Sequence, residues 1–440
     1  HMCFAKTLIL SKTGDIRPFS KDADGTVLGE GIGMVVLKRL TQAEKDGDQI
    51  YAVIKGMGSS SDGRSQSIYA PRAEGQAEAL RMAYAHAQVE TGTIGLVEAH
   101  GTGTRVGDRV ELNALKTVFG SDNGNRNLTA LGSVKSMIGH TKAAAGAAGL
   151  IKATLALKNK VLPPTLKAQQ TDPELNLEES PFYINSFTRP WLPRQGHPRR
   201  AAVSSFGFGG SNFHLVLEEY DSQKKGVSWD GSVEIFAFSA QDRQTVSKKL
   251  VELKEGVDET LSDPAMVNRL AADTRSGFAV DAPCRLLFVH AMTGVPDNDR
   301  EQLKRIIDDA QTALTDVAQP GMRTKTHDIF FSDKPKPGKL AFIFPGQGSQ
   351  YLDMGRDLCC VFPEALNAIA LTDALAGSDE PISVSVFPCG SSGPEIKKSL
   401  QKRLNRTDIA QPAIGGISLA MFDILQRFGI HPDATGGHSY

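Results

Sequence analysis

The chain has 440 residues, of which 40% are hydrophobic and 22% charged, and its formal net charge at pH 7 is −1. This length predicts two or three domains of about 100–200 residues each, with sizeable apolar cores. The near-neutral charge is not that of a nucleic-acid-binding protein. The longest apolar stretch, 143–157, contains Lys152 and is shorter than the roughly 20 residues of a membrane span. No secretion signal is visible. We therefore expect no nucleic-acid or membrane partner.

The cysteine pattern argues against a metal site. The five cysteines are Cys3, Cys284, Cys359, Cys360 and Cys389. None stands in a Cys-x-x-Cys pair or at a typical Cys/His ligand spacing, so no metal is expected. Cys359 and Cys360 are neighbours, and adjacent cysteines seldom form a disulfide. We expect reduced thiols and a cytoplasmic location.

Residues 1–220 combine short apolar runs with glycine turns. The runs 34–37, 51–54 and 94–97 predict strands, the first of them buried on both faces. Between them, residues 74–87 carry apolar side chains at helical spacing. Strands that alternate with helices indicate an α/β architecture.

Residues 221–338 are more polar and predict a separate domain. Residues 233–238 read as a strand, after which Ser239 is expected to cap a helix, with Asp242 three positions on. Four apolar side chains share one face of that helix: Val246, Leu250, Leu253 and Val257.

A second helix in this region, 300–314, precedes the linker-like segment 332–338, which is the clearest boundary in the chain. From residue 339 the pattern changes again. Residues 340–344 have the composition of a buried strand and run directly into Pro345-Gly346-Gln347-Gly348-Ser349-Gln350.

Three glycine-dense turns carry the candidate chemistry of the first region. His100 follows the predicted strand 96–99 and begins His-Gly-Thr-Gly-Thr, which presents the hydroxyls of Thr102 and Thr104. His140 lies at a second turn, before a helix of small residues over 142–157. A third turn occupies 204–214.

Taken singly, these turns have simpler explanations, because a lone histidine is usually structural and most glycine turns are only turns. Gly29-Glu30-Gly31-Ile32-Gly33 lacks the helix that follows a nucleotide-binding loop. Asp22-Ala23-Asp24-Gly25 lacks the later ligands of a calcium loop. Neither segment is expected to be a site.

Together and in this order, the three turns resemble those of the decarboxylating β-ketoacyl synthases over residues 1–220. The match includes Asp108 and Glu111 after the first histidine and Lys135 before the second. Residues 60–63 and 68–71 make the chain most similar to type I polyketide synthases and polyunsaturated fatty acid synthases. The resemblance implies a thiolase-like α/β fold.

The resemblance also implies a mechanism. An acyl chain is held on a cysteine, a malonyl group on a carrier protein loses CO₂, and the resulting carbanion attacks the acyl thioester. By motif position, neutral His100 and His140 donate hydrogen bonds to the malonyl thioester oxygen. Thr102 and Thr104 contact the phosphopantetheine arm of the carrier protein.

Two further residues receive roles in the same way. Phe208 gates the acyl pocket and its backbone N–H serves the oxyanion, while Lys135 is expected to position rather than to carry a proton. Cys3 is not the nucleophile, because it lacks the family's nucleophile turn and stands too close to the strand entry at 17–19. The nucleophilic cysteine is expected upstream, so that the chain begins inside this domain.

The last hundred residues resemble malonyl-CoA:carrier acyltransferases. The match includes 344–350, the block 407–414 and the terminal Gly437-His438-Ser439-Tyr440, the first part of a Gly-x-Ser-x-Gly nucleophile elbow. The resemblance makes Ser439 the nucleophile, gives an oxyanion hole from the N–H groups of Gln347 and Tyr440, and places Gln411 at the substrate. Without the two upstream blocks, His438-Ser439 reads as an ordinary terminal dipeptide.

The sequence departs from the acyltransferase pattern at its end. It stops before the elbow's last glycine, before the arginine that pairs with the malonyl carboxylate and before the catalytic histidine. His431 precedes the elbow and does not replace that histidine. Residues 221–338 fit the linker domain that joins the two enzymes in the family.

We therefore predict a thiolase-like α/β ketosynthase portion (1–220), an α+β linker domain (221–338) and the start of an α/β-hydrolase-like acyltransferase (339–440). The expected substrates are malonyl-CoA and the 4′-phosphopantetheine arm of an acyl carrier protein, with no directly bound cofactor. The expected partners are that carrier protein, the other domains of a synthase and a second copy in a homodimer through the ketosynthase. A non-decarboxylating thiolase and an inactive scaffold module remain the alternatives.

Overall fold

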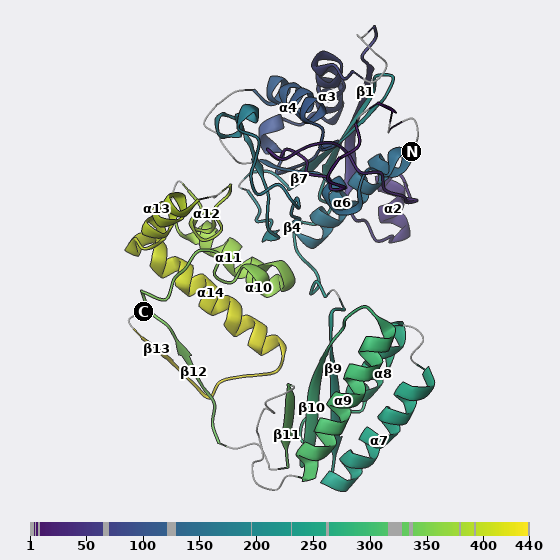
Figure 1. Cartoon of the computed structure of the whole chain (residues 1–440). Helices are drawn as coiled ribbons and strands as arrows, with labels where there is room; N and C mark the ends of the chain where they lie inside the picture. Colours follow the sequence, from purple (N-terminus) through teal and green to yellow (C-terminus); the bar gives the residue numbers. More distant parts are fainter. Residues whose placement is uncertain are drawn as a thin grey trace. The chain divides into compact units, whose positions relative to one another are not determined.

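The computed structural model describes most of the chain, namely residues 4, 6–7, 9–64, 70–120, 129–194, 196–229, 231–260, 264–315, 328–333, 338–377, 380–390 and 393–438. The chain divides into two compact units (Figure 1). The first consists of 1–228, 342–431 and 435–440, and the second of 229–341 and 432–434. The division into three domains stays a prediction.

A six-stranded mixed sheet forms the centre of residues 1–228, with the strand order β1-β8-β7-β2-β3-β5. The pairs β1–β8 and β8–β7 are antiparallel, whereas the pairs β7–β2, β2–β3 and β3–β5 are parallel. The strands are β1 Val53–Ser61, β2 Leu96–Glu98, β3 Thr129–Gly132, β5 Phe182–Ile184, β7 Arg200–Gly207 and β8 Ser211–Glu218. The strands predicted at 51–54 and 94–97 are thus present, and each begins two residues later than expected.

Helices cover both faces of this sheet (Figure 1). On one face, Val97 and Leu131 share a buried cluster with Leu80 of α3 (Ala73–Ala87) and Leu112 of α4 (Arg105–Phe119). On the other face, alternate strand residues pack with α6 (Ala145–Asn159), namely Leu96, Ala130 and Ala201 with Ala153 and Leu157. Successive strand residues point to opposite faces, so both faces are buried. The predicted helix at 74–87 is confirmed.

Shorter elements complete this part. They are α2 Leu40–Asp46, η1 Thr91–Thr93, α5 Lys135–Ile138, η2 Lys142–Ala144, β4 Val161–Leu162, η3 Pro173–Leu175, η4 Leu177–Glu179 and β6 Arg189–Pro190. Strands β4 and β6 pair antiparallel with each other.

The prediction of a doubly buried strand at 34–37 is wrong. The segment is extended but belongs to no strand, and the exposed fractions of Met34 and Val36 are 87% and 99%. An apolar run is buried only where another segment covers it, and no strand of the described residues pairs with this one.

The second unit is an α+β domain, as predicted. Its antiparallel sheet has the order β11-β10-β9, and its members are β9 Val233–Ala240, β10 Cys284–Ala291 and β11 Ile329–Ser332. Three helices accompany it, α7 Arg243–Thr260, α8 Pro264–Ser276 and α9 Pro296–Thr315. The four apolar residues predicted to share one face of α7 are all buried in the core: Val246, Leu250, Leu253 and Val257.

The predicted cap of α7 needs a correction. Ser239 lies inside β9, and its hydroxyl accepts a hydrogen bond from the Ala279 N–H at 2.8 Å. The strand continues to Ala240, so α7 begins at Arg243 and Asp242 takes the capping position. The carboxylate of Asp242 accepts from the Thr245 N–H at 2.7 Å.

Five helices pack together in the C-terminal part of the first unit: α10 Arg356–Val361, α11 Pro363–Leu375, α12 Ile382–Val386, α13 Pro394–Leu404 and α14 Thr407–Arg427. Strands β12 (Ala341–Phe344) and β13 (Ala434–Gly437) form a two-stranded sheet beside them. The strand predicted at 340–344 is present as β12. The strand was expected to be buried, but the side chain of Ile343 is 74% exposed.

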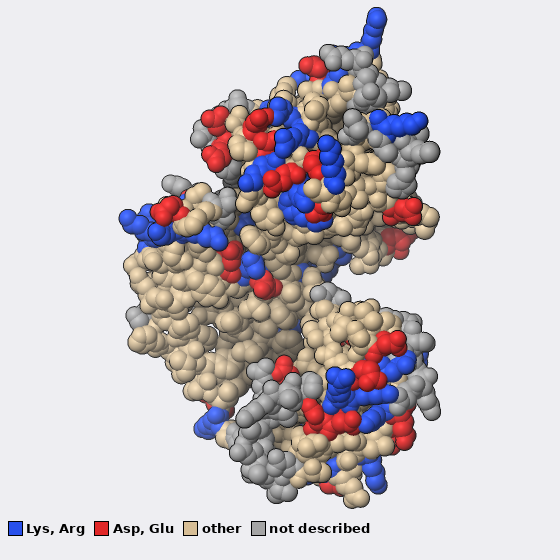
Figure 2. All heavy atoms as spheres, in the orientation of Figure 1, with Lys and Arg blue, Asp and Glu red and all other residues tan. Residues whose placement is uncertain are grey.

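Helix α14 is the one helix among the described residues that is long and apolar enough to cross a membrane by these two criteria alone. It contains Pro412, and its residues Ala413, Ile414 and Ala420 are buried against the neighbouring helices. The core helix of a folded domain meets the same criteria, so the packing favours that reading. Basic and acidic side chains are intermixed on the visible surface (Figure 2).

Candidate active site

The structure brings His100 and His140 together. His100 follows β2, and His140 lies between α5 and η2. Their ring centroids are 5.2 Å apart and the ring planes are nearly perpendicular, at 84°. Both side chains line a cavity of about 1040 Å³. Two turns that the sequence analysis identified separately therefore form one site.

The loop after His100 is held by close backbone approach. Gly101 has φ +42°, and a Cβ atom there would lie 2.7 Å from Cβ of Ser133. The Ser133 hydroxyl donates to the Gly101 carbonyl at 3.0 Å. Since Ser133 immediately precedes the segment that leads to His140, this contact joins the two histidine loops.

Two buried carboxylates of α4 hold the same loop by accepting hydrogen bonds from its backbone N–H groups. Glu111 accepts hydrogen bonds from the N–H groups of His100 and Gly101 at 2.7 and 2.8 Å. Asp108 accepts from the N–H groups of Gly103 and Phe19 at 3.1 and 2.8 Å. Burial raises the pKa of each carboxyl to about 7.

These contacts give Asp108 and Glu111 a role that the sequence analysis did not assign. The sequence feature that could have indicated this role is the i, i+3 spacing of the two residues directly after the glycine-rich turn. On a helix, this spacing places both carboxylates on one face. The carboxylates on that face accept hydrogen bonds from the backbone N–H groups of the turn.

His140 is fixed through its backbone and its ring. Its N–H donates to the Val27 carbonyl at 2.7 Å, and its carbonyl accepts from Gly29 at 3.0 Å. Nδ1 of the ring accepts from the Lys142 N–H at 3.0 Å. In the neutral ring the proton therefore resides on Nε2, which is left to donate.

Both histidines are held in the neutral form. Burial lowers the pKa of His100 well below its usual value, and the nearby Lys135 and His140 act in the same direction. Burial also lowers the pKa of His140 to about 4, aided by the positive charges of Lys135 and Lys142. At neutral pH the site thus presents two uncharged imidazoles.

Lys135 is 2% exposed. Burial lowers the pKa of its ammonium group, while the carboxylates of Glu98, Glu111 and Asp108 oppose that effect. Its charge disfavours the protonated form of both histidine rings. The positioning role of Lys135 stays a prediction.

Thr102 and Thr104 also line the cavity. Thr104 is the N-cap of α4 and accepts from the Gly107 N–H at 3.3 Å. The two hydroxyls are 2.9 Å apart and share a hydrogen bond. A hydroxyl can donate one hydrogen bond and accept two. The contact of Thr102 and Thr104 with the phosphopantetheine arm stays a prediction.

Phe208 lies in the turn between β7 and β8, where Gly209 and Gly210 both have positive φ. Its ring lines the cavity, is 57% exposed and lies 5.8 Å from the ring of Phe4. Asp62 anchors the turn, because its N–H donates to the Gly210 carbonyl at 2.9 Å and its carboxylate accepts from Asn212 at 2.8 Å.

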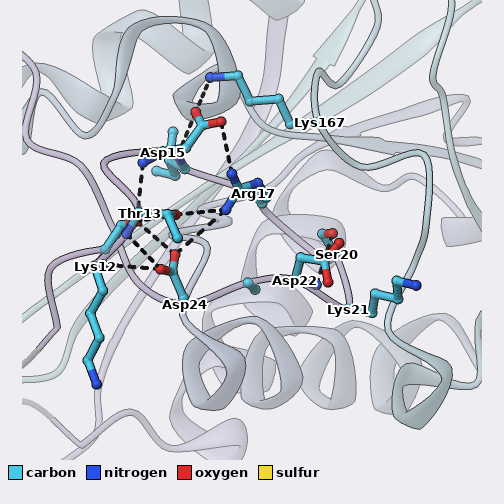
Figure 3. A network of polar contacts seen from close by, with 12 residues as sticks. Lys12, Thr13, Asp15, Arg17, Ser20, Lys21, Asp22, Asp24 and Lys167 are labelled. Atoms are coloured by element: carbon cyan, nitrogen blue, oxygen red, sulfur yellow. Dashed lines mark hydrogen bonds and ion pairs between the residues drawn. The ribbon is translucent and has the colours of Figure 1, made fainter.

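A polar network shapes the loop at one side of the cavity (Figure 3). Asp24 accepts from the Ser11 hydroxyl at 2.7 Å and from the N–H groups of Lys12 and Thr13. Arg17 pairs with Asp15 at 3.3 Å and donates to Thr13. Asp24 thus serves as a loop anchor.

Within the described ranges, no group of three His, Cys, Asp or Glu side chains is placed to hold a metal.

The acyltransferase candidates are placed in part. The side chain of Gln347 donates to the Thr407 hydroxyl at the start of α14 at 3.1 Å, and half-buried Gln411 lies on the same helix. Ser439 and Tyr440 lie outside the described residues. The His438 N–H donates to the Phe344 carbonyl at 3.1 Å, so the chain before Ser439 runs beside the segment that leads to Gln347. His431 is exposed.

The fold and the site define a thiolase-like ketosynthase portion together with the start of an acyltransferase. Family models match the chain as the N-terminal domain of β-ketoacyl synthase over 1–43, its C-terminal domain over 51–169, the ketoacyl-synthetase C-terminal extension over 172–282 and an acyl transferase domain over 341–440. The chain belongs to the β-ketoacyl synthase family, in the ketosynthase–acyltransferase region of polyketide and polyunsaturated fatty acid synthases.

Two curated relatives agree with this assignment. The chain is 36% identical over 460 residues to a polyunsaturated fatty acid synthase from Thraustochytrium sp., and the match covers 100% of this chain and 16% of that protein. It is 35% identical over 447 residues to polyketide synthase GfsE of Streptomyces halstedii, covering 99% of this chain and 11% of that protein. The chain therefore spans only a small part of each relative.

Among solved structures, a ketosynthase from module 6 of the bacillaene synthase of Bacillus subtilis 168 is 35% identical to the chain, with a TM-score of 0.48. That match covers 75% of this chain and 54% of the solved one. The family models and the two relatives confirm the predicted family. The mixed sheet with helices on both faces agrees with the predicted α/β fold class. The role of each site residue stays a prediction.

Proposed function

We propose that the protein containing this chain joins acyl thioesters to malonyl-type units by decarboxylative Claisen condensation and loads those units onto a carrier protein by acyl transfer. The observation that supports the condensation is the pair of buried, neutral imidazoles of His100 and His140 with perpendicular rings 5.2 Å apart at one cavity.

In the proposed reaction, the bond between the malonyl α-carbon and its carboxylate breaks and CO₂ leaves. The electron pair remains on the α-carbon and spreads onto the thioester oxygen as an enolate. The Nε2–H of His140 and an N–H of His100 stabilise this oxygen, a role typically worth about 10²–10³ in rate per donor. The α-carbon then attacks the acyl thioester, and the enzyme's thiolate leaves.

Substrates and partners follow from this proposal. The 4′-phosphopantetheine arm of an acyl carrier protein enters the cavity past Thr102 and Thr104, and malonyl-CoA supplies the acyltransferase, whose nucleophile is Ser439. Similarity to the family supports a homodimer formed through the ketosynthase portion. A cytoplasmic location is supported by the four described cysteines, all of which are free.

The test uses the whole synthase. His140→Ala should lower malonyl decarboxylation by about 10²–10³ while acyl loading of the cysteine continues. His431→Ala is the matched control, because this histidine is exposed and lies far along the chain from the cavity residues. Decarboxylation within a few-fold of wild type in His140→Ala would refute the assignment. A wild-type synthase without any decarboxylation would instead favour the scaffold alternative.

A further inference from the structure

A buried ion pair of β2 and α6, the elements that precede His100 and follow His140, has no part in the reaction described above. The Glu98 carboxylate is 2.8 Å from Nζ of Lys152, and the side chains are 1% and 10% exposed. Replacing a buried ion pair with apolar residues is often neutral or stabilising. Stability alone is therefore a weak reason for two charges in this position.

The location of Glu98 suggests another role. It is the last residue of β2, just before His100. Its Oε1 atom accepts a hydrogen bond from the Val134 N–H at 2.5 Å, and Val134 immediately precedes α5, which leads to His140. Its Oε2 atom faces Lys152 on α6, the helix that follows His140. One carboxylate at the end of β2, two residues before His100, thus contacts the segments on both sides of His140.

The surrounding chain leaves little room around this carboxylate. A Cβ atom on Gly149 would lie 3.1 Å from Cγ of Glu98 and 3.2 Å from Val203. A Cβ atom on Gly132 would lie 2.6 Å from the Thr165 hydroxyl and 3.6 Å from Nζ of Lys152. Glycine at both positions lets α6 and the end of β3 approach the pair closely.

We propose that the Glu98–Lys152 ion pair is a positioning element, which sets the separation of the His100 and His140 loops and thereby the geometry of the two donors. This inference rests on the proposed condensing function. Neither Glu98 nor Lys152 is among the described residues that line the cavity. The pair acts by holding β2, the segment before α5 and helix α6 in one arrangement, and misplacement of catalytic donors by about 1 Å can cost 10²-fold in rate.

The test measures malonyl decarboxylation by the whole synthase. In Lys152→Met, kcat should fall about 10- to 100-fold while KM for the malonyl carrier protein stays within twofold, since the donors are displaced but the cavity remains. Lys152→Arg keeps the charge and should recover most of kcat. The double variant Glu98→Gln/Lys152→Met buries no charge, so it should fold normally and still show the low kcat.

The chain offers a matched control for a purely structural role. Lys160 and Glu219 form a second buried ion pair at 2.6 Å, with side chains 2% and 3% exposed, and Arg199 also pairs with Glu219 at 2.8 Å. Their hydrogen bonds within the described residues are with segments other than the histidine loops. Lys160→Met should lower the melting temperature without changing kcat per folded enzyme. A wild-type kcat in Glu98→Gln/Lys152→Met would overturn this inference. A wild-type synthase without decarboxylation would instead remove the proposed function itself.

Discussion

The backbone N–H of Lys142 donates to Nδ1 of His140 at 3.0 Å, and Lys142 adopts φ +55° in the turn that makes this contact. Positive φ is uncommon for residues other than glycine, and such conformations are concentrated at functional sites. Because Nδ1 accepts, the neutral imidazole must carry its proton on Nε2. This backbone turn therefore determines which nitrogen of His140 is a donor.

The protonation state of His140 is directly measurable. NMR of the chain with labelled histidine should show His140 as the Nε2–H tautomer, with a pKa of about 4. Lys142→Gly keeps the N–H and tolerates positive φ, so it should keep the same tautomer. An Nδ1–H tautomer, or a pKa near the usual 6.5, would contradict the structure. The lowered pKa of His140 also affects the stability of the fold. Its contribution to the free energy of unfolding is fully present above pH 6.5 and declines as the pH falls toward 4, because the histidine binds its proton in the unfolded chain at a higher pH than in the folded one.

Glu111→Gln should destabilise the fold by about 1–3 kcal/mol. A carboxylate accepts from the N–H groups of both His100 and Gly101, whereas an amide accepts through one atom only and presents N–H groups through the other. Chemical denaturation measures the difference. Glu174→Gln removes an exposed carboxylate and should change the stability by no more than about 0.5 kcal/mol. Equal effects of the two substitutions would show that the buried hydrogen bonds are not important.

The same carboxylate predicts a pH dependence. Burial raises the pKa of Glu111 to about 7, so the folded protein binds a proton that the unfolded chain releases near pH 4.5. The contribution of Glu111 to stability should therefore decrease as the pH rises from 4.5 through 7. The difference in unfolding free energy between wild type and Glu111→Gln, measured across that window, isolates this contribution. A difference that does not change with pH would contradict the raised pKa.

Gly139→Ala should destabilise the chain more than Gly120→Ala does. Both glycines have φ near +80° with extended ψ, at +74° and +82°, a region that is essentially restricted to glycine. A Cβ atom on Gly139 would lie 3.0 Å from the Val27 carbonyl oxygen, whereas one on Gly120 would meet no atom of the described residues within 4 Å. We expect about 1–3 kcal/mol for Gly120→Ala from the backbone alone and a larger loss for Gly139→Ala. Equal losses would show that the turn before His140 has room to relax.

Ser439 should accept the malonyl group in the intact acyltransferase. Incubation of the synthase with malonyl-CoA should add one malonyl group, and Ser439→Ala should prevent the addition, because the proposed function makes this serine hydroxyl the nucleophile. Mass spectrometry of the digested domain locates the group. Ser349→Ala is the control, since among the described residues its hydroxyl donates to the Gly346 carbonyl in its own turn. Malonylation of Ser439→Ala at another serine would remove the assignment.

Much of the local structure was predictable from the sequence. The apolar periodicity of α7 and the turns around His100 and His140 are properties of neighbouring residues, and they correctly indicated the elements and the family. The motif match also included Asp108 and Glu111, but it assigned them no role. Such patterns are local, because side-chain direction repeats with the helix or strand period and glycine marks the turns.

The tertiary structure determined which residues are buried and which partners they contact. The apolar run at 34–37 has the composition of a buried strand yet is exposed, and Ser239 lies within a strand that continues past the predicted cap. No sequence pattern showed that Glu111 binds the His100 loop or that Glu98 faces Lys152. Burial, hydrogen-bond partners and shifted pKa values arise from contacts between segments far apart in the chain. Those contacts determine that both imidazoles are neutral and which nitrogen of His140 donates.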